Sequence, residues 1–70
     1  MTAHHIRFEI EDDGIGVITI DRPEKRNAMT YAMLGAFIDA VRAAGEDDRA
    51  RVLIITGAGG TICAGTDLAD

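Results

Sequence analysis

A glycine-rich segment that follows an apolar run is the first candidate for chemistry in this sequence. Gly57-Ala58-Gly59-Gly60 comes directly after Val52-Leu53-Ile54-Ile55-Thr56. Glycines placed after a strand begin two known phosphate-binding motifs. The dinucleotide fingerprint G-x-G-x-x-G lacks its third glycine, because Ile62 stands there, and Thr61-Ile62-Cys63 does not supply the Gly-Lys-Ser/Thr of a P-loop. Taken alone, the segment indicates a turn as readily as a ligand site.

The residues after this segment could stabilise an anion through their main chain. Ile62 to Leu68 contains small residues and a glycine, which let a ligand approach the backbone closely. A helix that begins near Thr66 would present unpaired N–H groups at the positive end of its dipole, which suits an oxyanion. The same residues fit a capped loop in which Asp67 bonds its own backbone, and base rates favour that interpretation.

Basic side chains are sparse, and three of them are close together. Seven basic against twelve acidic residues give a net charge of −5, which argues against nucleic acid or an anionic membrane as the main partner. Arg22, Lys25 and Arg26 lie within five residues. Without further context, Lys25 and Arg26 fit a solvated loop better than a binding site.

Metal ligands and nucleophiles are few. Cys63 is the one cysteine, so no internal disulfide can form, and with His4 and His5 it supplies too few ligands for a structural zinc site. Cys63 has no base placed beside it and is interpreted as a packing residue. The two histidines are interpreted as surface residues of a mobile terminus. Met1 to Ile10 has the pattern of neither a signal peptide nor a membrane span, so we expect a cytoplasmic protein.

Period-two patterns predict two strands. Ile6, Phe8 and Ile10 alternate with polar residues, and Val17-Ile18-Thr19-Ile20 is rich in β-branched residues. The turn-forming cluster Glu11-Asp12-Asp13-Gly14 lies between them. We therefore expect an antiparallel hairpin over residues 6–10 and 15–20.

A helical period follows over residues 31–44. Thr30 is the expected N-cap and Gly45 the expected C′ residue. Met29, Met33 and Phe37 are expected in the core. One apolar stripe is expected along the helix, made by Met33, Leu34, Phe37, Ile38 and Val41.

The apolar run after the helix predicts a strand over residues 52–56, parallel to the second strand, because a strand that is apolar on both faces is typical of a covered parallel sheet. The helix would cross over between the two strands and cover one face of the sheet. The other face needs a cover that this chain does not contain, and the sequence stops after Leu68-Ala69-Asp70 with no closing element. A chain of 70 residues with no staple is expected to be marginal alone, so we expect it to be part of something larger.

Two segments carry a family signature. Thr19 to Met29 has a strand, Arg-Pro, variable residues and then Asn-Ala, and Val52 to Gly57 is followed by Cys63 to Leu68. In this order, with one helix between them, they resemble the crotonase (enoyl-CoA hydratase/isomerase) superfamily. The resemblance implies an α/β fold, a crotonase-like ββα spiral fragment made of a β-hairpin, a crossover helix, a parallel strand and the start of a further helix. Residues 1–70 would then be the amino-terminal part of a single domain, with the rest of the domain absent from this chain.

The resemblance also implies a role for each matching residue. Lys25, Arg26 and Ala28 match the loop that borders the adenine and phosphate end of CoA. Asp67 and Leu68 match residues that line the pantetheine and acyl entrance. All the positions matched to CoA or substrate binding are Lys25, Arg26, Ala28, Ala64, Gly65, Asp67 and Leu68.

Thr66 matches the position whose backbone N–H donates to the thioester oxygen. The second donor is a glycine N–H in a later segment. Two residues depart from the family pattern, which often has phenylalanine at Ile62 and alanine at Thr66. The N–H survives at Thr66, but its branched side chain narrows the expected acyl site. Asn27 is interpreted as structural, tying its loop to neighbours through its side chain.

The implied activity is acyl-CoA thioester chemistry in which an oxyanion hole stabilises an enolate-like intermediate. Enoyl-CoA hydratase, a lyase, is the first hypothesis, with the acid/base carboxylates after Asp70. Isomerase, hydrolase and decarboxylase reactions remain open, as does a non-catalytic CoA-binding or structural member of the fold. The expected partner is an acyl-CoA substrate that carries CoA with it. No tightly bound cofactor, metal, nucleic acid or membrane is expected, and the family suggests a homo-oligomer, a trimer or a dimer of trimers.

Overall fold

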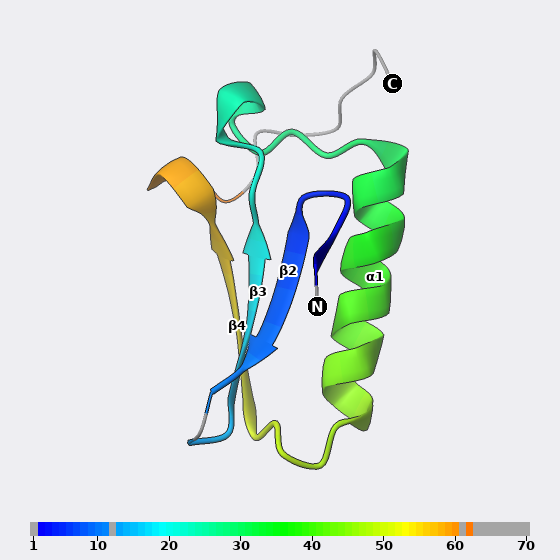
Figure 1. Ribbon diagram of the computed structural model, residues 1–70, viewed down its shortest axis with the longest axis vertical. Helices are drawn as coiled ribbons and strands as arrows, with labels where there is room; N and C mark the ends of the chain where they lie inside the picture. Colours follow the sequence, from blue (N-terminus) through cyan, green and yellow to red (C-terminus); the bar gives the residue numbers. More distant parts are fainter. Residues whose placement is uncertain (1, 12, 61, 63–70) are drawn as a thin grey trace.

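The described part of the chain forms a mixed four-stranded sheet with one long helix on one face (Figure 1). The computed structural model describes residues 2–11, 13–60 and 62. The sheet order follows the sequence order of the strands, and α1 packs against β2 and β3. The elements are β1 (Thr2–Ala3), β2 (Ile6–Ile10), β3 (Ile15–Ile20), α1 (Tyr31–Glu46) and β4 (Val52–Gly57).

The predicted hairpin is confirmed. β2 and β3 pair antiparallel with Phe8 opposite Ile18. The turn between them is closed by two backbone hydrogen bonds, from Glu11 N to Ile15 O (2.9 Å) and from Gly14 N to Glu11 O (3.0 Å). Gly14 has a φ of 85°, which an L side chain rarely adopts. The turn cluster in the sequence therefore marked the place where the chain reverses.

The predicted parallel strand and crossover helix are also confirmed. β4 runs parallel to β3, with Ile15 opposite Val52 and Ile20 opposite Gly57. The strand begins beside the hairpin turn, where Arg51 N donates to Gly14 O at 2.7 Å. This bond sets the register of the parallel pair at its first residue.

The start of the chain differs from expectation. Thr2 and Ala3 form the short strand β1, which pairs antiparallel with β2, so this segment is part of the sheet rather than a mobile terminus. His4 and His5 make the two-residue turn and are exposed, each with a positive φ (48° and 65°). Positive φ at both central residues is what a tight type I′ hairpin turn requires. The pairing of β1 with β2 was not predicted, because a strand of two residues is too short to show an alternating apolar pattern. Histidine is also not a residue that usually marks this type of turn.

The helix begins as predicted and ends two residues later. Thr30 Oγ1 accepts a hydrogen bond from Met33 N at 3.0 Å, which satisfies one N–H of the first turn. Gly45 is not the C′ residue but lies inside α1, which ends at Glu46, with Asp47 as its C-cap. The turn that follows is formed by side-chain bonding instead of by a glycine.

Asp47 and Arg49 close that turn. Asp47 Oδ1 accepts from Arg49 N at 2.9 Å, and Asp47 Oδ2 pairs with Arg49 Nη2 at 2.8 Å. The side-chain hydrogen bond from Arg49 lowers the pKa of Asp47 to about 2. A carboxylate that bonds the backbone two residues on can redirect the chain without positive φ, which explains why no glycine is needed here.

The helix face that packs on the sheet is made largely of small residues. Met33 and Phe37 pack in or against the core, and so does Met29 before the helix, as predicted. The predicted stripe is wrong in its other members, because Leu34, Ile38 and Val41 are 44%, 48% and 38% exposed. Alanines at helical spacing occupy the buried face in their place. The buried core residues are Ile6, Phe8, Ile18, Ile20, Met33, Ala40 and Ala44.

The parallel edge strand remains largely uncovered within the described part of the chain. Val52, Ile54 and Ile55 are 57%, 46% and 40% exposed. Figure 1 shows β4 on the side of the sheet away from α1. This agrees with the expectation that part of the sheet needs a cover from elsewhere.

Replacing two glycines by alanine should move stability in opposite directions. A methyl group at Gly14 would lie 3.0 Å from Arg49 O and adopt φ +85°, so Gly14→Ala should destabilise the complete protein by at least about 1–2 kcal/mol. At Gly35, on the helix, nothing lies within 4 Å of the added group, so Gly35→Ala should stabilise it by up to about 1 kcal/mol. Thermal or urea unfolding measures both, and a Gly14→Ala variant as stable as the wild type would contradict the turn geometry.

Candidate functional site: two loops at one edge of the sheet

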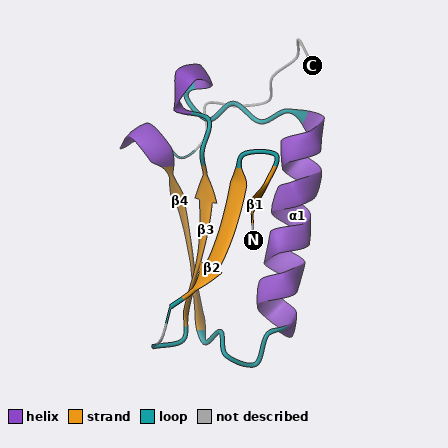
Figure 2. Cartoon of the chain, viewed as in Figure 1, coloured by secondary structure: helices purple, strands orange, loops and turns teal. Residues whose placement is uncertain are grey.

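Two loops leave the same edge of the sheet. The first loop, residues 21–29, follows β3 and contains a short 3₁₀ helix, Pro23–Lys25. The second loop follows β4 and is described over residues 58–60, which form another short 3₁₀ helix, Ala58–Gly60. Because β3 and β4 are parallel, their carboxyl ends meet at one edge, and Figure 2 shows both short helices there. The topology thus brings the basic cluster of the sequence next to its glycine-rich segment.

The first loop is closed by its own backbone. Arg26 N donates to Pro23 O at 3.0 Å, Asn27 N to Arg22 O at 2.9 Å, and Ala28 N to Lys25 O at 3.0 Å. Arg26 and Asn27 both have positive φ, 50° and 59°. Asparagine adopts this region more readily than most residues, which suits the second position. The loop therefore holds its shape before any ligand arrives.

Asn27 bonds both loops from a fully buried position. Its exposed fraction is 0%. Its Oδ1 accepts from Arg22 N at 2.7 Å, and its Nδ2 donates to Ala58 O at 2.8 Å. The amide orientation follows from its partners, because an N–H can only donate and a carbonyl can only accept. The interpretation of Asn27 as a structural tie is confirmed.

The Arg22 side chain forms a hydrogen bond within the first loop. Its Nη1 donates to Ala28 O at 3.0 Å, across the open side of the loop. The side chain is part of the first loop's internal bonding, so its charge is held at the loop's base. The sequence places Arg22 in the same basic cluster as Lys25 and Arg26, but Arg22 is not among the positions matched to CoA binding, and no local pattern predicts its bond to Ala28 O.

A close backbone contact adds to the tie between the loops. A methyl group at Gly59 would lie 3.0 Å from Pro23 Cβ, and Gly59 has a φ of 77°. The second loop can approach the proline ring this closely because it carries glycine at that position.

The expected site residues fall into two groups. Lys25 and Arg26 are exposed on the first loop, and Ala28 beside them is half-buried. The remaining site positions lie outside the described residues, as does the expected start of a further helix. Those positions are Ala64, Gly65, Thr66, Asp67 and Leu68.

The sequence matches one family over most of its length. The model of the family described as Enoyl-CoA hydratase/isomerase matches residues 10–70. The chain belongs to the enoyl-CoA hydratase/isomerase family. The resemblance to the crotonase superfamily is thereby confirmed.

Individual members of this family are similar to the chain in sequence and in structure. It is 46% identical to "Probable enoyl-CoA hydratase" of Rhodobacter capsulatus over 100% of this chain and 26% of that protein. It is 44% identical to hydroxycinnamoyl-CoA hydratase-lyase of Pseudomonas fluorescens over 90% of this chain and 22% of that protein. A crystal structure of an enoyl-CoA hydratase/isomerase from Xanthobacter autotrophicus has a TM-score of 0.88 and 37% identity, and covers 97% of this chain and 25% of that one. The chain spans about a quarter of the length of these relatives.

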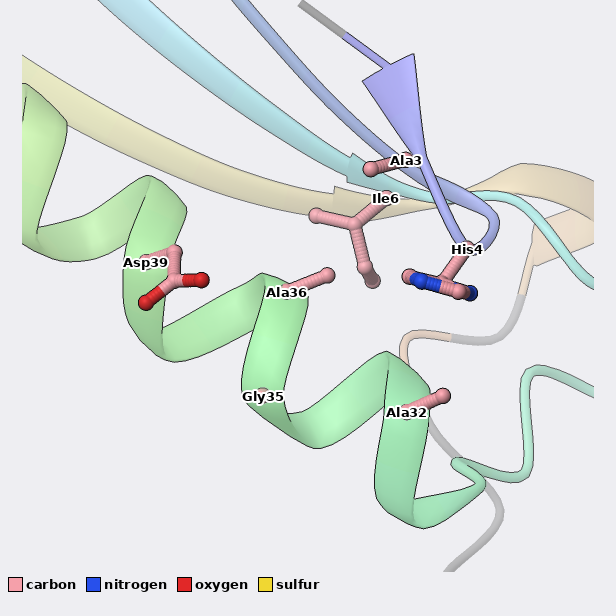
Figure 3. A pocket seen from close by; sticks show the side chains of 7 residues that line it. All are labelled: Ala3, His4, Ile6, Ala32, Gly35, Ala36 and Asp39. Atoms are coloured by element: carbon pink, nitrogen blue, oxygen red, sulfur yellow. The ribbon is translucent and has the colours of Figure 1, made fainter.

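A cavity lies elsewhere in this member of the enoyl-CoA hydratase/isomerase family, and its lining is mostly apolar. It measures about 400 Å³ and lies between the β1–β2 turn and α1. Figure 3 shows His4 and Asp39 at its two ends with apolar side chains between them. Its lining consists of Ala3, His4, Ile6, Ala32, Gly35, Ala36 and Asp39. None of these residues belongs to either loop, so the cavity is separate from the candidate site.

The described residues contain no group of three or more His, Cys, Asp or Glu side chains that could hold a metal ion. Within the same part of the chain, no helix is both long and apolar enough to cross a membrane.

The Pro23–Gly59 contact can be tested with a matched pair of substitutions. Gly59→Ala and Gly60→Ala both place an alanine at positive φ, 77° and 86°, but only the first would meet Pro23, since nothing lies within 4 Å of a methyl group at Gly60. We expect Gly59→Ala to lower the free energy of unfolding of the complete protein by about 1 kcal/mol more than Gly60→Ala. Denaturant unfolding of both variants measures the difference, and equal losses would show that the loops are not in close contact.

Proposed function

We propose that the complete protein acts on acyl-CoA thioesters and that its reaction is the hydration of a 2-enoyl-CoA. The observation that carries the proposal is the pair of loops at one sheet edge, one basic and one glycine-rich, bonded through Asn27 and Ala58 in a member of this family. Relatives named as hydratases of CoA thioesters support the substrate class.

The first loop binds the phosphate and adenine end of CoA in this proposal. Lys25 and Arg26 are exposed on a loop whose backbone is already closed, so their charges can meet phosphate oxygens with little ordering of the main chain. Ala28 is small and half-buried beside them, which suits the adenine border that the family resemblance implies. The main chain of Ala64 contacts the adenine in this proposal, and Asp67 and Leu68 line the pantetheine and acyl entrance. Gly65 lies between them in sequence and completes the binding positions.

The second loop leads to the oxyanion donor. We assign this role to the backbone N–H of Thr66, with a glycine N–H from a later segment as its partner. Two N–H groups placed where the thioester oxygen gains negative charge would stabilise an enolate-like intermediate more than the ground-state substrate. The acid and base carboxylates belong to the parts of the relatives that this chain does not match.

Two alternative functions are kept beside the hydratase. In the first, the protein is a non-catalytic member of the fold that binds CoA without converting it. In the second, the protein catalyses another reaction through the enolate-like intermediate, and the similarity to a hydratase-lyase supports this alternative. We also propose a cytoplasmic homo-oligomer, a trimer or a dimer of trimers, with no tightly bound cofactor. The family resemblance supports the assembly, and the single cysteine supports the compartment.

The complete protein should hydrate crotonyl-CoA, and the isolated chain of residues 1–70 should not. The isolated chain lacks the second oxyanion donor and the acid/base carboxylates, and it leaves Val52, Ile54 and Ile55 largely exposed. Loss of the enoyl-thioester absorbance measures turnover. CoA binding by the complete protein without turnover of any enoyl-CoA would favour the non-catalytic reading. Turnover by the isolated chain would contradict the placement of the catalytic groups.

Two substitutions at Thr66 separate its backbone from its hydroxyl. Thr66→Ala keeps the N–H and should change kcat by less than about tenfold, or about 1.4 kcal/mol. Thr66→Pro removes the N–H and should lower kcat by about 10²–10³-fold, the usual loss for one oxyanion donor. A hydroxyl is the poorer candidate because it must give up rotational freedom to point at the charge.

Circular dichroism and CoA affinity serve as controls, because proline can also distort the loop. The assignment to the backbone is wrong if the alanine variant loses as much activity as the proline variant while both stay folded and bind CoA.

A further inference from the structure

The two loops are joined by a tie whose two ends can be cut separately. Asn27 Oδ1 accepts from Arg22 N at 2.7 Å, which is a bond within the first loop. Asn27 Nδ2 donates to Ala58 O at 2.8 Å, which is a bond to the second loop, 31 residues away. The first bond shapes the loop that carries Lys25 and Arg26. The second bond fixes where the chain goes after β4.

The bond to Ala58 has energetic weight because Asn27 is fully buried. A buried polar group that loses its hydrogen-bond partner is strongly disfavoured, so the amide favours one position of the Ala58 carbonyl. The Gly59 backbone against Pro23 limits movement of the same segment in another direction. The second loop is thus set by the first loop at two points.

We propose that Asn27 is a positioning residue for catalysis, because it holds Ala58, at the start of the second loop, in place against the first loop, on which CoA binds in the proposed function. The inference rests on the proposed function. Asn27 touches neither substrate nor reacting atoms in this proposal. It fixes the position of Ala58 relative to the loop that carries Lys25 and Arg26.

Asn27→Asp cuts the bond between the loops and keeps the bond within the first loop. One carboxylate oxygen still accepts from Arg22 N, while the other faces the Ala58 carbonyl, where a donor stood. At neutral pH we expect CoA affinity in the complete protein to stay within about threefold of the wild type, because the first loop keeps its shape. We expect kcat for crotonyl-CoA hydration to fall by about 10²-fold, the scale of a misplaced catalytic group.

A pH profile gives a signature that general loosening of the structure would not. Burial and the facing carbonyl disfavour the charged form of an aspartate at position 27, so its pKa should be raised. The protonated carboxyl group can donate to Ala58 O again. The kcat of the Asn27→Asp variant, relative to the wild type at the same pH, should therefore recover as the pH falls.

Two other variants complete the comparison. Asn27→Gly accepts the positive φ and removes both bonds, so CoA affinity and kcat should both fall. Arg42→Ala, at an exposed position on α1 outside both loops, should leave both quantities at their wild-type values. If Asn27→Asp does not fold, Gly59→Ala displaces the second loop from its other contact and should show the same loss of kcat with CoA affinity retained.

Amide hydrogen exchange tests the tie without relying on turnover. In the Asn27→Asp variant the amides of residues 57–60 should exchange faster than in the wild type, while those of residues 24–28 stay unchanged. Unchanged exchange at residues 57–60, or a wild-type kcat in the variant at neutral pH, would overturn the inference. If the wild type turns over no enoyl-CoA, the proposed function fails, and the inference falls with it as a statement about catalysis. The exchange result then decides separately whether Asn27 positions the second loop.

Discussion

The parallel pairing of β3 with β4 is the constraint on which the candidate site depends. Parallel neighbours must be joined by a crossover, because their carboxyl ends lie at the same edge. Here the crossover is α1, whose 16 residues span about 24 Å at about 1.5 Å per residue, close to the roughly 20 Å of the six-residue β4. The helix therefore returns the chain to the start of β4 with short connections. The loops that follow β3 and β4 therefore begin side by side at the same edge of the sheet.

The register of this pair determines which residues meet. Ile20 lies opposite Gly57, so Asp21 and Ala58 leave the sheet at the same level. Six residues after Asp21 the first loop turns back at Asn27, whose side chain reaches Ala58 O. A slip of one residue along β4 would move the carbonyl away from the amide and would turn the side chains of the strand to the opposite face. The bond between the loops is therefore a consequence of strand pairing that begins at the Gly14 turn.

Most of the fold could be predicted from the sequence because strands and turns are encoded by residues that are close together in the chain. Period-two alternation over residues 6–10 and the β-branched run at Val17 to Ile20 are properties of neighbours in sequence, and they predicted the hairpin correctly. The helix face was misjudged because large apolar residues were taken to mark the core. Leu34 and Ile38 are large yet exposed, whereas Ala40 and Ala44 are small and buried against the sheet. Which side of a helix lies on a sheet is decided by fit, and alanine carries little hydrophobic signal.

The candidate site was predictable to the extent that it resembles a family motif. The Asn-Ala motif predicts a CoA-binding role for Lys25 and Arg26, which the structure places at exposed positions on a loop. Nothing near Arg22 in the sequence shows that its guanidinium bonds Ala28 O. The partner of Asn27 lies 31 residues away, so its identity depends on tertiary structure that no local pattern carries. The asparagine after Arg-Pro in a tight loop predicted a structural hydrogen bond from its side chain. It did not predict that the partner in the second loop is Ala58 O.

The pairing of basic side chains differs between the first loop and other parts of this acidic chain. Arg49 is paired with Asp47, Arg7 lies 3.7 Å from Asp21, and Arg22 bonds within its own loop. Lys25 and Arg26 are exposed at the tip of a loop that is already closed by backbone bonds. Binding a phosphate there would order side chains, at up to about 2 kcal/mol each, without also ordering the backbone. The loop's internal bonding thus favours affinity indirectly, because it removes the largest entropic cost that a flexible basic loop would have to meet.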